Sequence, residues 1–283
     1  MDLAQLQALA AAVDEGSFDG AASALHVTPS AVSQRIKALE SSTGRVLVRR
    51  SKPTEVTEAG EVYLRLARQI DALVRDAEDG DAPVSVPLAI SADALATWAL
   101  PALATLPSWV TVDVRRDDQD HTAELLRAGT VMAAVTSVSA PVQGCSSTRL
   151  GSMRYRPMAS PAFAARWFPD GGTAAELDAA PMLVFDRKDD LQDRYLRERS
   201  SRRLDPPRHH VPGSTEFAAA VRLGMGWGML PDQQTVGTGD CTVQFDPSRH
   251  LDVVLYWQQW SLRTPALEAV ASALRTAAGE ALS

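Results

Sequence analysis

The chain is poor in cysteine and in long apolar segments, and both shortages exclude classes of protein. Only two cysteines, Cys145 and Cys241, occur in 283 residues, with no CxxC pair, so neither a disulfide framework nor a structural zinc site is expected. No apolar run approaches the roughly 20 residues that span a membrane. The N-terminal segment also lacks the basic start of a signal peptide. We therefore expect a cytoplasmic protein that has no membrane partner, no metal and no cofactor.

Catalytic signatures are missing too. The sequence contains no GxSxG, GxxxxGK[ST] or HExxH motif. The adjacent His209 and His210 would point to opposite faces of a strand, which is poor for ligating one metal. The sequence therefore favours a binding protein over an enzyme. An architectural DNA binder is a third class, and it predicts no small ligand at all.

Negative charge dominates the chain, except in one short segment. The net charge is -7, but between His26 and Lys52 the only acid is Glu40, against six basic residues: Arg35, Lys37, Arg45, Arg49, Arg50 and Lys52. A local basic patch is sufficient to dock on phosphates, because counterion release depends on local contacts. The acidic remainder fits a ligand-binding module.

The same segment carries the signals of a winged helix-turn-helix. Ser17 or Asp19 can cap a second helix, and Thr28 followed by Pro29 is a strong start for a third. In that third helix Val32, Ile36 and Leu39 face inward, while the opposite ridge carries short polar groups and cations, as reading base edges in a major groove requires. Gly44 ends this helix. Residues 46–50 and 55–57 then predict the two strands of a wing, where Arg49 or Arg50 could pair with Glu40 or support the wing.

A long helix from Thr57 to about residue 79 follows the wing. Its apolar residues repeat at three and four positions: Tyr63, Leu66, Ile70, Leu73 and Ala77. Such a seam predicts pairing with a second chain, and packing on its own domain is the alternative. Residues 80–83 break the pattern and predict a hinge.

From Val84 onward strands alternate with helices. We expect strands at 86–90, 109–114, 131–136, 182–185, 226–230 and 253–257, and helices at 93–105, 122–127, 190–198, 216–223 and after Thr264–Pro265. This alternation predicts an α/β domain with a mostly parallel sheet.

Residues 17–60 strongly resemble the LysR-type transcriptional regulators, with matching residues at Ser17–Phe18, Ala21–Ala22, the run 25–36, Leu39–Glu40, Gly44, Leu47, Arg50 and 57–60. The resemblance implies a winged helix-turn-helix (1–57), a linker and dimerisation helix (58–80), and an α/β effector domain (84–283). That domain would be two-lobed and like the type 2 periplasmic binding proteins, with lobe I at about 84–160 and 231–283 and lobe II at about 161–230. Val48 and Gly20 depart from the family's usual residues.

A narrower resemblance, to the ArgP/LysG branch, covers nearly the whole chain. It is carried by 91–98, 120–122, 131–137, 141–145, 155–156, 160–164 and 186–193. It implies a regulator that senses lysine or arginine, or histidine, and activates an exporter gene for basic amino acids. A LysR-type regulator of another operon, with a different small effector, is the alternative. The implied partners are promoter DNA, RNA polymerase and further copies of the chain, as a dimer or a dimer of dimers.

The resemblance assigns DNA contacts to Thr28, Pro29, Ser30, Ser33, Gln34, Arg35, Arg50 and Lys52. Helix capping alone would also explain Thr28 and Pro29. Gln34 would read bases, whereas Lys52 would enter the minor groove from the wing.

Candidate effector contacts follow from the chemistry of a basic amino acid. Its carboxylate suits a helix N-terminus, and ligands sit at the carboxyl ends of strands; Ser91, Thr136 and Ser137 have such positions. Its cations need acids. The candidates for these contacts are Asp93, Asp117, Asp118, Asp120, Asp186, Asp189 and Asp190, with Trp98 as a possible wall. An aspartate before a helix is, however, often only a cap, and a tryptophan on an apolar helical face is often core.

Overall fold

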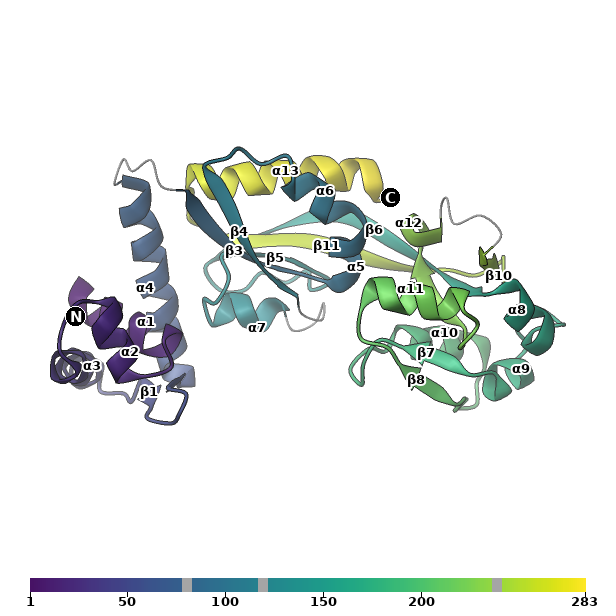
Figure 1. Cartoon of the computed structure of the whole chain (residues 1–283), viewed down its shortest axis with the longest axis horizontal. Coiled ribbons are helices and arrows are strands. Elements are labelled where there is room, and N and C mark those ends of the chain that lie inside the picture. Colours follow the sequence, from purple (N-terminus) through teal and green to yellow (C-terminus); the bar gives the residue numbers. More distant parts are fainter. Residues whose placement is uncertain (78–82, 117–121, 236–240) are drawn as a thin grey trace.

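The computed structural model describes residues 1–77, 83–116, 122–235 and 241–283 (Figure 1). The candidate effector residues Asp117, Asp118 and Asp120 lie outside this part of the chain. The N-terminal head and the larger α/β domain stand side by side, with the long helix α4 between them (Figure 1).

The head contains three short helices, of which the second and third begin at predicted caps and the third ends at Gly44 as predicted. They are α1 (Leu3–Asp14), α2 (Phe18–Ala24) and α3 (Pro29–Thr43). The Ser17 hydroxyl accepts a hydrogen bond from the Gly20 amide at 3.0 Å, and Thr28 accepts one from the Ala31 amide at 3.2 Å. Gly44 ends α3 with a left-handed φ of 67°, a conformation that glycine adopts without a steric penalty.

The wing consists of the antiparallel strands β1 (Val48–Arg49) and β2 (Glu55–Val56). The Glu40 carboxylate accepts a hydrogen bond from the backbone amide of Leu47 at 2.8 Å. This bond ties α3 to the entry of the wing. Of the two roles considered for Arg49 or Arg50, an ion pair with Glu40 is not found among the described residues, which leaves support of the wing.

Helix α4 (Glu58–Ala77) packs mainly on its own head. Tyr63, Leu66 and Ile70 of the predicted seam contact the head's hydrophobic core, whereas Leu73 is 45% exposed. Those three residues therefore follow the alternative interpretation of the seam, because α1 already covers them. Val62 and Leu73 remain exposed on this helix.

The remaining elements build the α/β domain. The helical elements are α5 (Ala92–Ala94), η1 (Leu95–Ala99), α6 (Leu100–Leu103), α7 (Thr122–Arg127), α8 (Pro161–Trp167), α9 (Ala174–Ala179), α10 (Leu191–Arg199), α11 (Ser214–Arg222), α12 (Asp232–Thr235) and α13 (Pro265–Ala281). The strands are β3 (Val84–Ile90), β4 (Val110–Arg116), β5 (Ala133–Thr136), β6 (Cys145–Ala159), β7 (Met182–Val184), β8 (Arg208–His210), β9 (Gly228–Pro231), β10 (Val243–Gln244) and β11 (Leu251–Trp260). None of the described helices is long and apolar enough to cross a membrane.

The large sheet is mixed, not mostly parallel as the alternation of elements predicted. Its seven strands run in the order β10-β6-β11-β5-β3-β4, with β9 also paired to β6. The pairs β3–β4 and β3–β5 are parallel, whereas β6 pairs antiparallel with β9, β10 and β11, and β11 antiparallel with β5. No strand was predicted at β6, whose long pairing with β11 accounts for most of the antiparallel ladder.

Two lobes result, joined by the long strands β6 and β11 (Figure 1). One lobe carries β3, β4 and β5 under α13, and we call it the sheet lobe. The other carries β7, β8 and helices α8 to α11, and we call it the second lobe. In the second lobe a separate buried cluster forms where α11 packs on β7 and β9, and it includes Leu183, Phe217 and Val221.

Candidate functional site

The outer face of α3 and the wing carry the residues predicted to contact DNA. Thr28, Pro29, Ser30 and Gln34 are exposed, and Ser33 and Arg35 are partly buried. The inward face of the helix is fully buried, as its apolar spacing predicts. The backbone therefore presents the predicted ridge to solvent.

The two wing residues in the predicted set differ in their surroundings. The guanidinium of Arg50 lies 5.2 Å from the centre of the Phe18 ring, within the range of a cation–π interaction. This contact orients Arg50 and ties the wing to α2. Lys52, in contrast, is exposed at the tip of the wing.

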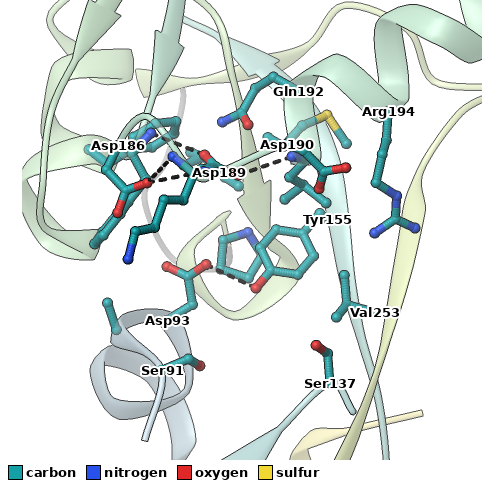
Figure 2. Close-up of a pocket in the computed structure, with 18 of the residues that line it drawn as sticks. Ser91, Asp93, Ser137, Tyr155, Asp186, Asp189, Asp190, Gln192, Arg194 and Val253 are labelled. Atoms are coloured by element: carbon teal, nitrogen blue, oxygen red, sulfur yellow. Dashed lines mark hydrogen bonds between the residues drawn. The ribbon is translucent and has the colours of Figure 1, made fainter. Parts of the chain in front are cut away.

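A cavity of about 290 Å³ lies between the two lobes of the α/β domain (Figure 2). Typical small-molecule sites measure about 300–1,000 Å³. The polar side chains that line the cavity are Ser91, Asp93, Arg116, Ser137, Tyr155, Asp186, Lys188, Asp189, Asp190, Gln192, Arg194 and Gln234. They come from segments that are far apart in the sequence.

Six predicted effector residues meet in this cavity: Ser91, Asp93, Ser137, Asp186, Asp189 and Asp190. Two others do not line it. Trp98 is 5% exposed and packs in the main core, where its indole N–H has no described partner. Thr136 is fully buried, and its hydroxyl accepts a hydrogen bond from the Val138 amide at 3.2 Å. The strand ends where predicted, but only its next residue, Ser137, faces the cavity.

The hydroxyl of Ser91 is engaged as a helix cap. It accepts a hydrogen bond from the Ala94 amide at 3.4 Å, and the residue is 4% exposed. Ser91 therefore contributes to the wall at the start of α5.

The acids of the second lobe brace their own loop. One oxygen of Asp186 accepts hydrogen bonds from the amides of Lys188 and Asp189 at 2.7 and 3.0 Å. The carboxylate of Asp189 accepts bonds from the amides of Phe185 and Leu191, both at 3.0 Å. These bonds fold the loop that leads into α10.

Asp190 is paired as well. It forms an ion pair with Arg197 at 3.2 Å, and both side chains are more than 60% exposed. The acids of this loop thus already have partners within the second lobe.

Asp93 has different surroundings. Its carboxylate accepts a hydrogen bond from the Tyr155 hydroxyl at 2.9 Å and a second from Ser214. Burial raises the pKa of the Asp93 carboxyl, against the lowering effect of its two hydroxyl partners. Figure 2 shows Asp93 below Tyr155, with Asp186 and Asp189 on the opposite side of the cavity.

Several cavity residues were not predicted. Gln192, in the first turn of α10, is 2% exposed, and its carbonyl oxygen has no partner among the described residues. Tyr155, Arg116, Arg194 and Gln234 also reach the cavity. Tyr155 and Gln192 lie in segments that carry the family resemblance, 155–156 and 186–193, whereas no local signal marks Arg116, Arg194 and Gln234.

The α/β domain contacts the head through α7 and α4. The guanidinium of Arg65 donates a hydrogen bond to the Arg127 carbonyl at 3.2 Å, and Arg68 donates one to the Ala128 carbonyl at 3.5 Å. Arg68 also forms an ion pair with Asp14 of α1. These cations lie at the C-terminal end of α7, where the helix dipole favours positive charge.

Gly129 permits this close approach. A Cβ on it would lie 2.7 Å from the Cα of Arg65, and its φ is +69°. Arg65 is 9% exposed. The junction is therefore tightly packed.

Comparisons with known proteins cover both parts of the chain. Residues 3–61 match the model of the bacterial regulatory helix-turn-helix proteins of the lysR family, and residues 84–279 match the LysR substrate binding domain. The regulator LysG of Mycobacterium tuberculosis is 46% identical over 285 residues, which cover 98% of this chain and 94% of that protein.

Two solved structures are similar over the whole chain. ArgP from Mycobacterium tuberculosis has a TM-score of 0.93 at 45% identity and covers 98% of this chain and 97% of its own. Full-length LysG from Corynebacterium glutamicum with bound effector Arg has a TM-score of 0.85 at 38% identity, and it covers 100% and 99%. These relatives regulate transcription, and the LysR family is not a family of enzymes. The chain belongs to the LysR family of bacterial transcriptional regulators.

Proposed function

We propose that this protein is a DNA-binding transcriptional regulator that senses a basic amino acid, lysine or arginine, in the cavity between its lobes. The observation that carries the proposal is the likeness of the whole chain to a solved relative that binds arginine, together with the cavity between the lobes. A protein 38% identical over the full chain is known with arginine bound, and the corresponding domain here has an interlobe cavity lined by acids, cations and hydroxyls. By binding promoter DNA the protein would activate a gene for export of basic amino acids, as the name of a 40% identical lysine export regulator suggests.

The chemistry of the cavity fits a zwitterion that carries an additional cation. Arg116 and Arg194 can neutralise a carboxylate, and Asp93 can accept hydrogen bonds from an ammonium or guanidinium group. The buried carbonyl oxygen of Gln192 has no described partner, and an unsatisfied buried acceptor costs about 1–3 kcal/mol. A ligand N–H group would satisfy it. Ser91, Ser137, Asp186 and Asp189 complete the proposed walls.

The head supplies the DNA-binding surface. Thr28, Pro29, Ser30, Ser33, Gln34 and Arg35 would meet the major groove or its phosphates, and Arg50 and Lys52 would extend the contact at the wing. Such a protein works where the genome is, in the cytoplasm. It would bind as a dimer or a dimer of dimers that straddles two or more half-sites, and it would contact RNA polymerase at the promoter.

A physical route from ligand to DNA runs through α7. Arg116 ends β4 and lines the cavity, and Ser137 follows β5 and also lines it. Helix α7 lies between these strands in the sequence, and its C-terminal carbonyls bind Arg65 and Arg68 of α4. A ligand that favours one arrangement of the lobes can thereby favour one placement of the heads, provided that it binds the two states with different affinity.

Titration calorimetry on the full chain tests the proposal. We expect lysine or arginine to bind and to be recovered unchanged. Promoter binding and transcription would then be measured with lysine, arginine and histidine added separately. Identical footprints and identical transcription with all three and without them would overturn the effector assignment, and chemical conversion of the ligand would overturn the sensor function.

A further inference from the structure

Among the acids that line the cavity, Asp93 differs in that side-chain hydroxyls from two distant segments, rather than amides of its own loop or an arginine, donate to it. Asp186 and Asp189 accept hydrogen bonds from backbone amides, and Asp190 is paired with Arg197. Asp93 accepts bonds from two hydroxyls, those of Tyr155 and Ser214. A carboxylate offers about four lone-pair positions, so Asp93 can accept further hydrogen bonds from the cavity.

The position of Asp93 also connects the two lobes. Asp93 belongs to α5 in the sheet lobe, whereas Ser214 begins α11 in the second lobe. The side-chain amide of Gln234 donates a hydrogen bond to the Ser214 hydroxyl oxygen at 2.6 Å. Because that oxygen acts as the acceptor, the Ser214 proton is available to be donated to Asp93. Tyr155 approaches from β6, one of the two strands that join the lobes. A change in the charge or partners of Asp93 therefore acts on α5, α11 and β6 together.

We infer that Asp93 is the residue that selects a positively charged ligand, by accepting a hydrogen bond from a ligand ammonium or guanidinium group at the lobe boundary. This inference rests on the proposed function, because it assigns the charge recognition of that same cavity to one residue. A cation would give this partly buried carboxylate the charged partner that its hydroxyls do not provide. The bond would also stabilise the contact from Asp93 to Ser214, and so the closed arrangement of the lobes.

A basic amino acid has two groups that could fill this role, its α-ammonium and its side-chain cation. Three ligands separate them. L-lysine has both cations, L-norleucine lacks the side-chain ammonium, and 6-aminohexanoate lacks the α-ammonium. The ligand analogue that lacks the group bound by Asp93 should bind wild-type protein and the Asp93→Asn variant with equal affinity.

Calorimetry with the full-length protein provides the test. We expect Asp93→Asn to weaken lysine binding roughly 10- to 150-fold, which corresponds to one hydrogen bond to a charged group. The same substitution should weaken the binding of one analogue, L-norleucine or 6-aminohexanoate, and leave the affinity for the other unchanged. Asp252→Asn is the matched control: Asp252 is bound to Arg154 at 2.8 Å and does not line the cavity, so its loss removes an equal charge and should leave all three affinities as they are.

The possible outcomes separate this inference from the proposed function. If wild-type protein binds lysine, and Asp93→Asn binds it equally well or loses the same factor for all three ligands, the assignment of Asp93 is wrong and the proposed function stands. If wild-type protein binds neither lysine nor arginine, both fail. Thermal unfolding without ligand checks that Asp93→Asn is folded, and Asp93→Ala serves as a second variant should the amide disturb the Tyr155 and Ser214 bonds.

Discussion

The DNA-reading head and the ligand cavity are built in opposite ways. The head takes its polar surface from one continuous segment, residues 28–52, and the helix in that segment, α3, is fixed by the Thr28 cap at its start. The cavity draws on at least six separate segments, from Ser91 to Val253. A surface whose residues are neighbours in the sequence can move as a rigid unit. A cavity whose walls come from two lobes changes shape whenever the lobes move. The rigid surface therefore suits DNA recognition by the head, and the deformable cavity suits ligand sensing by the α/β domain.

The most severe way to separate the two regions is to unfold the head alone. A Cβ at Gly60 would lie 2.1 Å from the Leu47 carbonyl oxygen, so Gly60→Ala must displace the wing from α4. We expect the head to lose about 3 kcal/mol or more of stability, at the upper end for overpacking, and DNA binding to be lost. Calorimetry should still detect ligand binding in the cavity, and gel-shift assays should detect no promoter complex.

Gly279→Ala is the control for this variant. It lies in α13, where an added Cβ meets nothing within 4 Å, and alanine favours a helix by up to about 1 kcal/mol. If Gly60→Ala abolished ligand binding as well, the two regions would not be independent units.

How far each region could be predicted follows from the same contrast. The caps at Ser17 and Thr28 and the end at Gly44 were correct from the sequence, because the groups that satisfy a helix end lie within a few residues of it. Strand β6 was missed, because its pairing with β11 joins residues about 100 positions apart. Trp98 was placed at the cavity although it lies in the core, since helical spacing alone does not distinguish which partner covers an apolar face.

The acids illustrate the limit most clearly. Asp93, Asp186 and Asp189 all follow strands and all line the cavity, so position along the chain does not distinguish them. Their hydrogen-bond partners do: backbone amides of the same loop for two of them, and hydroxyls from β6 and α11 for Asp93. Only the folded structure brings Tyr155 and Ser214 to Asp93.

Within the head, base reading and phosphate binding should be separable. Gln34→Ala should lower the preference for the operator over other DNA by about 1–3 kcal/mol, the value of one good base contact. Lys52→Ala should instead weaken binding to all sequences and reduce the slope of affinity against salt by about one. Fluorescence anisotropy on operator and scrambled DNA, at several salt concentrations, distinguishes the two. A Gln34→Ala protein with an unchanged specificity ratio would show that α3 does not read bases.

The junction of the two regions can be weakened without changing either one. Arg65→Met keeps the length of the side chain but removes its hydrogen bond to the Arg127 carbonyl. We expect ligand affinity, measured by calorimetry without DNA, to stay the same. The free energy by which ligand changes DNA affinity should fall by about 1 kcal/mol, the net value of a typical hydrogen bond. Arg127→Met is the matched control, since only the backbone carbonyl of Arg127 takes part in this contact. Equal behaviour of both variants would exclude the α4–α7 contact as the route of coupling.

The smallest expected effect concerns the stability of the unliganded sensor as a function of pH. Burial raises the pKa of the Asp93 carboxyl above its usual value of 3.8, so the folded protein holds this proton more tightly than the unfolded chain does. Between the usual and the raised pKa, the free energy of unfolding should therefore fall as pH rises. Lys188, Asp186 and Asp189 on the facing loop contribute their own fields, so the comparison must be made between variants that leave them intact. Asp93→Asn lacks this proton, and its stability relative to wild type should increase as pH rises through that window and then remain constant. Denaturant unfolding of both proteins across this range measures the difference, and a difference that is independent of pH would show that Asp93 gains no proton affinity on folding.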